Sequence, residues 1–330
     1  MNDDLLNDAI EQLLADHATP RAVRAIERGG SHAEIWNAIE DSGFCDALVP
    51  EDSGGAGLGL KEGFMLFEAC GRHAVPVPFA QTVMARALLA DAGHPAPQGA
   101  IALASGNAGA VDVPWGGTSD WVLVDDGATT RLFDARHADR EVLGGIVVDV
   151  RMQWPAAKAQ LQFESKHDLR AIEALVLSAQ ITGSMRHILA QTLQYADQRQ
   201  QFGRSIGKFQ AIQHQLVVMA EHIEMARMAV RMACASDTPW PDPLLAALAK
   251  ASTAESVVPV VAIAHAVHGA IGITEEYDLQ LHTRRLHAWR VAAGSEGYWQ
   301  QRIGRALLAQ PSTVPDFVRR QLSPASSASM

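Results

Sequence analysis

The chain has 330 residues, of which 48% are apolar and 19% charged, and its formal net charge is −10. This composition indicates a globular protein with a large core, and the acidic balance argues against a nucleic-acid partner, because phosphate binding needs clustered Lys and Arg. The three cysteines are widely spaced, which suits a reducing cytoplasm better than a disulfide framework or a zinc site. The acidic N-terminus lacks a signal-peptide pattern, and we expect no membrane span.

Residues 1–95 predict a helical region. Apolar residues such as Leu5, Ile10 and Leu13, and later Phe64 to Cys70, recur at helical spacing. The run PEDSGGAGLGL interrupts this periodicity and predicts a loop.

Residues 96–165 change in character and predict a small, shortened β domain. The runs 121–124, 130–133 and 159–163 are rich in strand-forming residues. Gly, Asp, Asn and Pro bound them, as turns between strands require.

Residues 166–310 return to long helical patterns. Their apolar stripes lie within 169–189, 212–230, 244–266 and 281–308. Four such patterns with short breaks predict an antiparallel four-helix bundle. The last residues, 311–330, end in SPASSASM and predict a flexible tail.

The segment YADQRQQFGRSIGKFQ, residues 195–210, carries the strongest local signal. A helix is expected to end near Gln198, and a turn with Gly203 and Gly207 leads into the next helix. Backbone amides at such a turn, beside the Arg199 guanidinium, suit a pyrophosphate. The alternative is that Arg199 is an ordinary surface residue and Gly203 a simple helix break.

Three segments together resemble the acyl-CoA dehydrogenase family. RQQFGRSIGKFQAIQ resembles the signature between the first two helices of that family's C-terminal bundle. PEDSGGAGLGL with FEACGRHAVPVPFAQTV resembles its N-terminal helical domain, and HGAIGITEEYDLQLHTRRL its loop between the third and fourth bundle helices. The resemblance implies a mainly α fold with a helical N-domain, a reduced β-barrel-like middle domain and a C-terminal four-helix bundle.

The resemblance also implies a cofactor, FAD, lying across a dimer interface. Arg199 would pair with the FAD pyrophosphate, an interaction for which an arginine fork is suited. Gly269, Ala270 and Gly272, in the loop between the third and fourth bundle helices, would approach the adenosine side of a flavin held by the neighbouring subunit. The implied cofactor-binding residues are Arg199, Gln201, Phe202, Gly203, Gly269, Ala270 and Gly272.

The middle region departs from the family pattern. The Thr-Glu-Pro…Gly-Ser-Asp and Trp-(Ile/Val)-Thr/Ser stretches, which cradle the flavin ring and the thioester in the family, are missing. The nearest remnant is VPWGGTSD, residues 113–120. We therefore expect that this chain does not complete a flavin site with its own β domain.

The catalytic base is the second departure. The reaction removes an α-proton from an acyl thioester, so it needs a carboxylate whose pKa is raised by burial. Most family members carry this glutamate before a Gly-Thr/Ser pair, where this chain has Ala293. Other members carry it on the first bundle helix, which points to Glu173. The alternative is that Glu173 is an ordinary solvated helix residue or one that pairs with Arg170. Glu296 is a weaker candidate for the base.

We expect no metal site. His265 and His268 share a helix face, but no third ligand joins them in the sequence, so capping or packing roles are favoured.

The sequence thus predicts a subunit of an FAD-dependent acyl-CoA dehydrogenase that introduces a 2,3-double bond and passes electrons to an electron-transferring flavoprotein. We expect an α2β2 hetero-oligomer in which a full-length homologous subunit supplies the flavin cradle and a glutamate, as in mixed dehydrogenases of bacterial steroid side-chain degradation. One alternative is a self-sufficient homo-oligomer that uses Glu173. Another is a non-catalytic structural or acyl-CoA-binding subunit.

Overall fold

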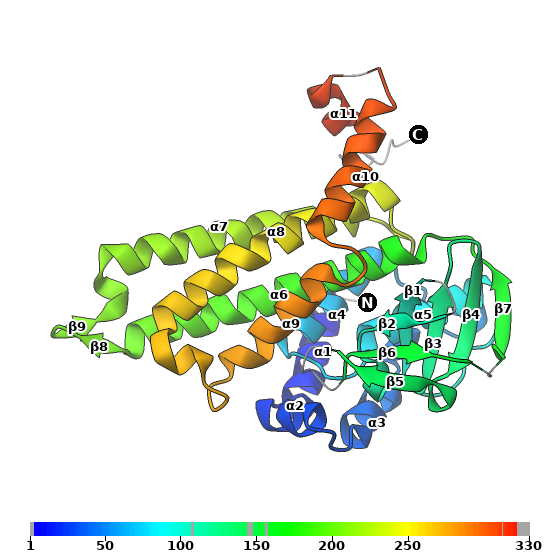
Figure 1. Cartoon of the computed structure of the whole chain (residues 1–330), viewed down its shortest axis with the longest axis horizontal. Helices are drawn as coiled ribbons and strands as arrows, with labels where there is room; N and C mark the ends of the chain where they lie inside the picture. Colours follow the sequence, from blue (N-terminus) through cyan, green and yellow to red (C-terminus); the bar gives the residue numbers. More distant parts are fainter. Residues whose placement is uncertain (1–2, 107–108, 144–147, 156–157, 312, 322–330) are drawn as a thin grey trace.

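The computed structural model describes residues 3–106, 109–143, 148–155, 158–311 and 313–321. Helices come first, a region of strands follows, and long helices complete the chain (Figure 1). The first helices are α1 (Asp3–His17), α2 (Pro20–Glu27), α3 (Ala33–Asp41), α4 (Leu60–Arg72) and α5 (Phe79–Asp91), with short 3-10 turns η1 (Phe44–Asp46) and η2 (Glu51–Ser53) between α3 and α4.

The strands lie between α5 and the long helices. They are β1 (Ile101–Ser105), β2 (Val111–Val113), β3 (Trp121–Asp125), β4 (Thr129–Asp134), β5 (Asp139–Val142), β6 (Val150–Gln153) and β7 (Leu161–Glu164), with 3-10 turns η3 (Gly116–Thr118) and η4 (Ala135–His137). In the described part of the chain they form two sheets, ordered β1-β3-β4-β7 and β2-β6-β5. Only the β1–β3 pair is parallel among these described pairings.

The two sheets share one hydrophobic core. Strands β1, β2, β3 and β6 bury their alternating apolar side chains between the sheets, and Phe133 stacks on Trp154 with ring centroids 4.7 Å apart. The predicted strands at 121–124, 130–133 and 159–163 correspond to β3, β4 and β7. The small β region was therefore predicted correctly.

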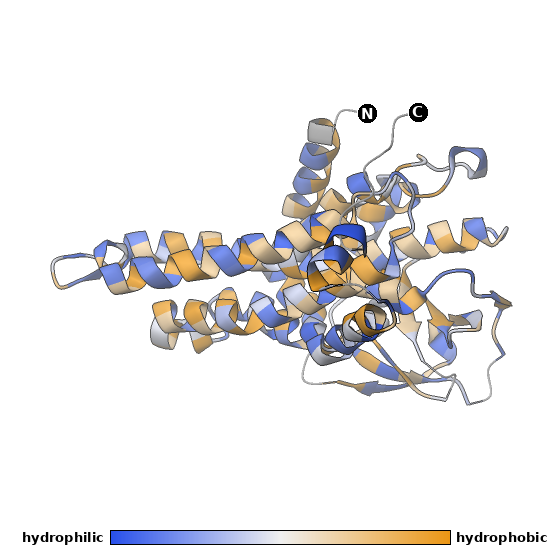
Figure 2. Ribbon diagram, turned by 90° about the horizontal axis from the view of Figure 1, so that it is seen from above, coloured by the Kyte–Doolittle hydropathy of each residue, from blue (hydrophilic) through white to orange (hydrophobic). Residues whose placement is uncertain are grey.

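The long helices form the bundle. They are α6 (Leu169–Gln198), α7 (Gln210–Ala233), α8 (Pro243–His268) and α9 (Leu279–Val291), followed by α10 (Glu296–Leu308) and α11 (Val314–Gln321). A short hairpin of β8 (Gln200–Gln201) and β9 (Arg204–Ser205), with turn η5 (Ile206–Lys208), links α6 to α7, and turn η6 (Gly269–Ile273) links α8 to α9. The bundle extends away from the sheets to a tip at β8 and β9 (Figure 1), and its helices carry apolar stripes (Figure 2).

The fourth apolar pattern, 281–308, is divided between two helices. Ala293 and Gly294 both have positive φ angles, +53° and +106°, which end α9 and redirect the chain into α10. Figure 1 shows α10 and α11 standing off the body. Residues 314–321, within the segment predicted as a flexible tail, form α11. This helix begins where the Thr313 hydroxyl accepts a hydrogen bond from the Asp316 amide. The SPASSASM residues lie outside the described part of the chain.

Aspartates begin two of the bundle helices. Asp168 accepts a hydrogen bond from the Ala171 amide at the start of α6, and Asp242 accepts two at the start of α8. Helix α8 with η6 is long and apolar enough to cross a membrane by composition alone. In the structure, however, α8 packs against α6, α7, α9 and α10, as the apolar central helix of a bundle does.

Glycines allow α4 and α6 to touch. A Cβ atom on Gly71 would lie 1.8 Å from the Gln180 carbonyl oxygen, and one on Gly183 would lie 1.8 Å from the Glu68 carbonyl oxygen. Beside this crossing, the buried Glu68 carboxylate forms ion pairs with Arg186 and Arg227. The N-terminal helices are therefore fixed to the bundle at the middle of α6.

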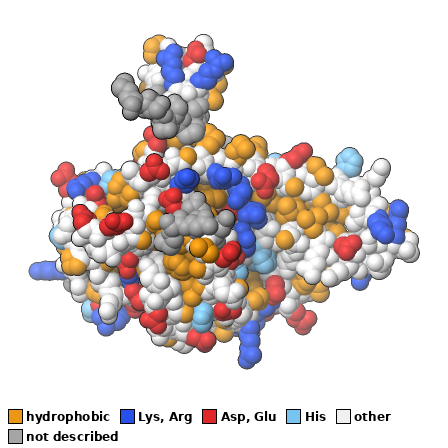
Figure 3. Space-filling view, turned by 180° about the vertical axis from the view of Figure 1, so that it is seen from behind, with side chains coloured by type: hydrophobic (Ala, Val, Ile, Leu, Met, Phe, Trp, Pro, Cys, Tyr) orange, Lys and Arg blue, Asp and Glu red, His pale blue; other side chains and the backbone are white. Residues whose placement is uncertain are grey.

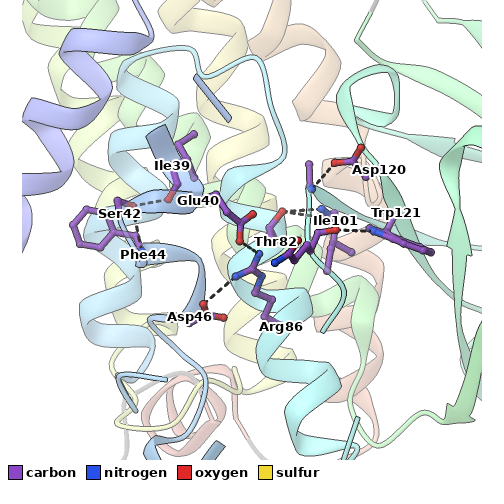
Figure 4. A network of polar contacts seen from close by, with 12 residues as sticks. Ile39, Glu40, Ser42, Phe44, Asp46, Thr82, Arg86, Ile101, Asp120 and Trp121 are labelled. Atoms are coloured by element: carbon purple, nitrogen blue, oxygen red, sulfur yellow. Dashed lines mark hydrogen bonds and ion pairs between the residues drawn. The ribbon is translucent and has the colours of Figure 1, made fainter. Parts of the chain in front are cut away.

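A polar network joins the first helices to the sheets (Figure 4). The buried Arg86 side chain, on α5, pairs with Asp46 at 2.9 Å and with Glu40 on α3. One turn earlier, the Thr82 hydroxyl accepts a hydrogen bond from the Ile101 amide at the start of β1. Helix α5 thereby sets the position of β1, whose far end forms part of the candidate site.

Candidate active site and cofactor clamp

Glu173 lies in the second turn of α6 and is buried, with 3% of its surface exposed. The Ser105 hydroxyl, at the end of β1, donates a hydrogen bond of 3.3 Å to its Oε2 atom. Burial raises the pKa of Glu173 to about 7, although the Ser105 hydrogen bond and the charges of Arg170 and Lys250 act in the opposite direction. The structure thus places a carboxylate that titrates near neutral pH where α6 meets the sheets.

Glu173 faces a cleft of about 540 Å³. The ends of β1 and β2 and helix α6 form its other walls, and the turn at 291–294 closes it. Ala293 lies in that turn, so Glu173 and Ala293 line the same cleft. The two positions that the sequence offered for a base therefore converge on one site, and only Glu173 has a side chain that can accept a proton.

Glu296 does not join this site. Its carboxylate pairs with Arg290, and this ion pair lowers its pKa although partial burial acts to raise it. A carboxylate held ionised by an arginine is a poor proton acceptor.

Trp115, in the VPWGGTSD segment, packs where three parts of the molecule meet. Trp115 is buried with a left-handed backbone at φ +58°, and its indole Nε1 donates to the Val75 carbonyl at 3.0 Å. Its ring lies 5.4 Å from that of Trp289 on α9. Trp115 therefore joins the first helices, the sheets and the bundle, and Pro114 beside it lines the cleft.

The other end of α6 has a different character. Arg199 caps the helix and is exposed, and among the described residues it forms no ion pair. The hairpin beyond it turns at Phe202 and Gly203, whose φ angles are +50° and +77°, as a two-residue hairpin turn requires. Phe202 is 93% exposed in this strained conformation, and Gln201 beside it is exposed as well.

The Gly269 turn lies beside this end of α6. The Tyr195 hydroxyl, one helical turn before Arg199, donates to the His268 carbonyl at 3.3 Å, and the two rings stack. Gly269, with φ +60°, and Ala270 are exposed, whereas Gly272 packs on His268. The structure therefore brings together all the positions at which FAD contacts were expected, and Figure 3 shows basic side chains at this tip of the bundle.

The two ends of α6 are too far apart to serve one ligand. At about 1.5 Å per residue, Glu173 and Arg199 are separated by about 39 Å along the helix. A dinucleotide is shorter than this distance. A cofactor held by Arg199 is therefore not the cofactor beside Glu173 of the same chain.

Comparisons with known proteins agree with this geometry. Residues 2–100 match the acyl-CoA dehydrogenase N-terminal domain, and residues 170–308 match the acyl-CoA dehydrogenase C-terminal domain. Acyl-CoA dehydrogenase IpdE2 of Mycobacterium tuberculosis is 32% identical over 86% of this chain and 90% of its own length. The chain belongs to the acyl-CoA dehydrogenase family. Its members are FAD-dependent oxidoreductases that act on the CH–CH bond of an acyl-CoA.

Solved structures share the fold of this acyl-CoA dehydrogenase over nearly its whole length. The ChsE4–ChsE5 complex of Mycobacterium tuberculosis gives a TM-score of 0.81 at 22% identity, covering 94% of this chain and 98% of the matched chain. The Tcur3481–Tcur3483 steroid acyl-CoA dehydrogenase gives 0.79 at 24% identity, covering 93% and 98%. The predicted family and fold are thus confirmed.

The residues at the tip fit an FAD diphosphate. Arg199 offers an exposed guanidinium, and the backbones of Gly203 and Gly269 border open space, with no atom within 4 Å of where a Cβ would lie. His268 adds a buried Nε2 atom that has no hydrogen-bond partner in the described structure.

One of the two histidines, His268, packs inside the protein. His268 is buried, and its Nδ1 atom bonds the Ala264 carbonyl at 2.8 Å, one turn earlier in α8. Among the described residues, no group of three His, Cys, Asp or Glu side chains has the arrangement of a metal site.

Sequence reasoning missed two residues that contribute to the Glu173 site, Ser105 and Lys250. Nothing in the sequence around Ser105 marks it as more than the last residue of a strand. The lysine did leave a signal, because it is the single charge in the apolar stretch 243–254 that forms the first half of α8.

Proposed function

We propose that this chain is a subunit of an acyl-CoA dehydrogenase in which Glu173 is the base that removes the α-proton of an acyl thioester. The observation that carries this proposal is the buried Glu173 carboxylate facing the cleft across from Ala293. A base whose pKa lies near the working pH accepts a proton most effectively, and the pKa of Glu173 is raised to about 7. FAD, when bound, supplies the acceptor for the β-hydride.

We further propose that the functional unit is an α2β2 hetero-oligomer of this chain and a full-length homologous subunit. Two observations support an assembly rather than an isolated chain: the distance between the ends of α6, and the missing flavin-cradling stretches in the sheets. Arg199, Gln201, Phe202 and Gly203, with Gly269, Ala270 and Gly272, would hold the diphosphate and adenosine portions of a cofactor whose ring lies in the neighbouring subunit. The solved ChsE4–ChsE5 relative is itself a complex.

The substrate class proposed is a bulky, ring-bearing acyl-CoA such as a steroid side-chain thioester. A second, mainly apolar cleft of about 480 Å³ adjoins the Glu173 cleft, with which it shares Asp112, Pro114, Val291 and Ala292. The two together offer more room than a linear acyl chain needs. One solved relative is named a steroid acyl-CoA dehydrogenase. We expect a cytoplasmic enzyme that passes its electrons to an electron-transferring flavoprotein.

Flavin counting tests the assembly. The chain is purified alone and with a full-length homologous dehydrogenase subunit, and the flavin absorbance per protein is measured in each sample. We expect a colourless protein alone and a yellow complex that oxidises ring-bearing acyl-CoA faster than linear acyl-CoA. A yellow, active protein from this chain alone would instead establish the self-sufficient homo-oligomer.

A substitution separates the catalytic proposal from a purely structural subunit. Glu173→Gln in the complex should remove activity while the flavin content is retained. Full activity in that variant would show that the partner supplies the base. If Arg199→Met also left the flavin content unchanged, the chain would be a structural subunit with no role at either site.

A further inference from the structure

Lys250, in α8, is fully buried. A lysine is seldom buried without partners, because removing the ammonium from water is costly. Its Nζ atom donates hydrogen bonds to the Trp289 carbonyl at 2.5 Å and to the Arg290 carbonyl at 2.9 Å. Lys250 therefore reaches across from α8 to the last turn of α9.

These carbonyls are at the helix end that adjoins the active-site cleft. The last carbonyls of a helix have no partner within the helix, and a positive charge there is favourable. The next residues, 291–294, form the cleft wall that faces Glu173. Lys250 thus supports this wall from behind.

Lys250 is also a charged neighbour of Glu173. Burial lowers the pKa of Lys250 to about 7, whereas Glu173 on α6 and Glu296 on α10 act to raise it and Arg290 on α9 acts to lower it. In return, Lys250 and Arg170 lower the pKa of Glu173 against the effect of burial. Glu296 is already paired with Arg290, whereas neither Glu173 nor Lys250 forms an ion pair with any of the described residues.

We propose that Lys250 is a positioning residue of the acid–base site: through its hydrogen bonds to the Trp289 and Arg290 carbonyls it anchors the cleft wall at 291–294, and it holds a buried positive charge behind the wall that faces Glu173. The inference deepens the proposed function and rests on it, because it assigns Lys250 to the support of the proposed base. If Lys250 only capped α9, its replacement would leave the titration of Glu173 unchanged.

Two substitutions distinguish charge from capping. Lys250→Met keeps a similar shape but loses both the charge and the donors, whereas Lys250→Gln keeps a donor and loses the charge. Because an opposite charge favours the ionised carboxylate, both variants should raise the pKa of Glu173. The expected shift in its titration midpoint is about one pH unit upward.

Carbon-13 NMR of the full-length chain labelled at the glutamate carboxyl carbons measures this shift directly. The resonance that disappears in Glu173→Gln identifies Glu173, and its midpoint is then compared in the wild type and the two Lys250 variants. An upward shift in both supports the proposal. An unchanged midpoint in both overturns it.

A reciprocal measurement covers the case in which the Lys250 variants do not fold. Coupling between two titrating groups acts equally in both directions. Glu173→Gln, which leaves Lys250 in place, should therefore lower the midpoint of Lys250, observed by NMR of the labelled lysine side chain. An unchanged Lys250 midpoint contradicts the proposal.

These readouts are separate from the test of the proposed function. In the flavin-containing complex, both Lys250 variants should move the acidic limb of the kcat profile to higher pH. Full activity of Glu173→Gln would refute the base assignment whatever the NMR shows. Unmoved titrations would refute the Lys250 role even where Glu173→Gln is inactive.

Discussion

The two ends of α6 differ in the charge and in the solvent exposure of the side chains that they carry. One end carries the carboxylate of Glu173, buried and facing a cleft between sheet and bundle; the other carries the guanidinium of Arg199, exposed beside an exposed Phe202. Burial is what changes the proton affinity of a carboxylate, whereas exposure is what allows a guanidinium to reach a ligand on another molecule. The contrast fits the proposal that one end of α6 takes part in the chemistry within the chain and that the other end binds a cofactor across an interface.

The largest effect should come from Glu173→Gln in the complex. We expect kcat to fall by about 10²- to 10⁴-fold, because an amide cannot accept the α-proton. In the unmodified enzyme, kcat should decline as pH falls below about 7, since protonation of Glu173 removes the base and its pKa is raised to that value. Steady-state kinetics from pH 5 to about 9 check both expectations.

The control for this experiment is the flavin content. If Glu173→Gln also lost its flavin, the loss of activity would reflect a damaged site rather than a missing base. In that case the contrast between the two ends would not hold.

Arg199→Met should weaken FAD binding by about 10- to 100-fold, the usual contribution of a charged hydrogen bond to a phosphate. The titration of apo complex with FAD, followed by fluorescence, measures the change. The acidic limb of the kcat profile should stay in place, because Glu173 is about 39 Å away along α6.

A matched control is Arg231→Met, which removes another exposed arginine, near the end of α7. Equal loss of FAD affinity in both variants would indicate a general charge effect and would count against a clamp at Arg199.

A smaller effect, on stability alone, should come from the middle of α6. Gly183→Ala places a Cβ against the Glu68 carbonyl oxygen and forces α4 away from α6, which should cost about 1–3 kcal/mol of unfolding free energy. Thermal denaturation should show Tm lowered by several degrees.

Gly304→Ala is the control for that change. It lies in α10 with no atom within 4 Å of the new Cβ, so alanine should be neutral or slightly stabilising there. Equal destabilisation by both substitutions would contradict the claim that close contact between α4 and α6 at Gly183 requires glycine.

Much of this architecture follows from sequence patterns, and some of it does not. The order of helical region, small β region and bundle was predictable because each has its own periodicity. The break at 292–295 was not, because the apolar pattern of 281–308 continues on both sides of it. Lys250 and Ser105 were missed because their partners lie 39 and 68 residues away in sequence, and only packing brings them together.

The site residues are a separate matter. Glu173 was chosen as the candidate base because it matches a position where some family members carry the catalytic glutamate. The sequence did not reveal whether its side chain is solvated. The answer depends on the end of β1 and on α8, neither of which is near Glu173 in the chain. The roles assigned to Glu173 and to Arg199 stay predictions until the substitutions are made.

The shared cleft of Glu173 and Ala293 has a consequence for how such enzymes diverge. Since positions 173 and 293 border one cavity, an ancestral chain with a carboxylate at each would have had two possible bases. Either carboxylate could then be lost while the other still accepted the proton. The catalytic base can then move from one position to the other by two substitutions, the gain of one carboxylate and the loss of the other, with an active enzyme at each step.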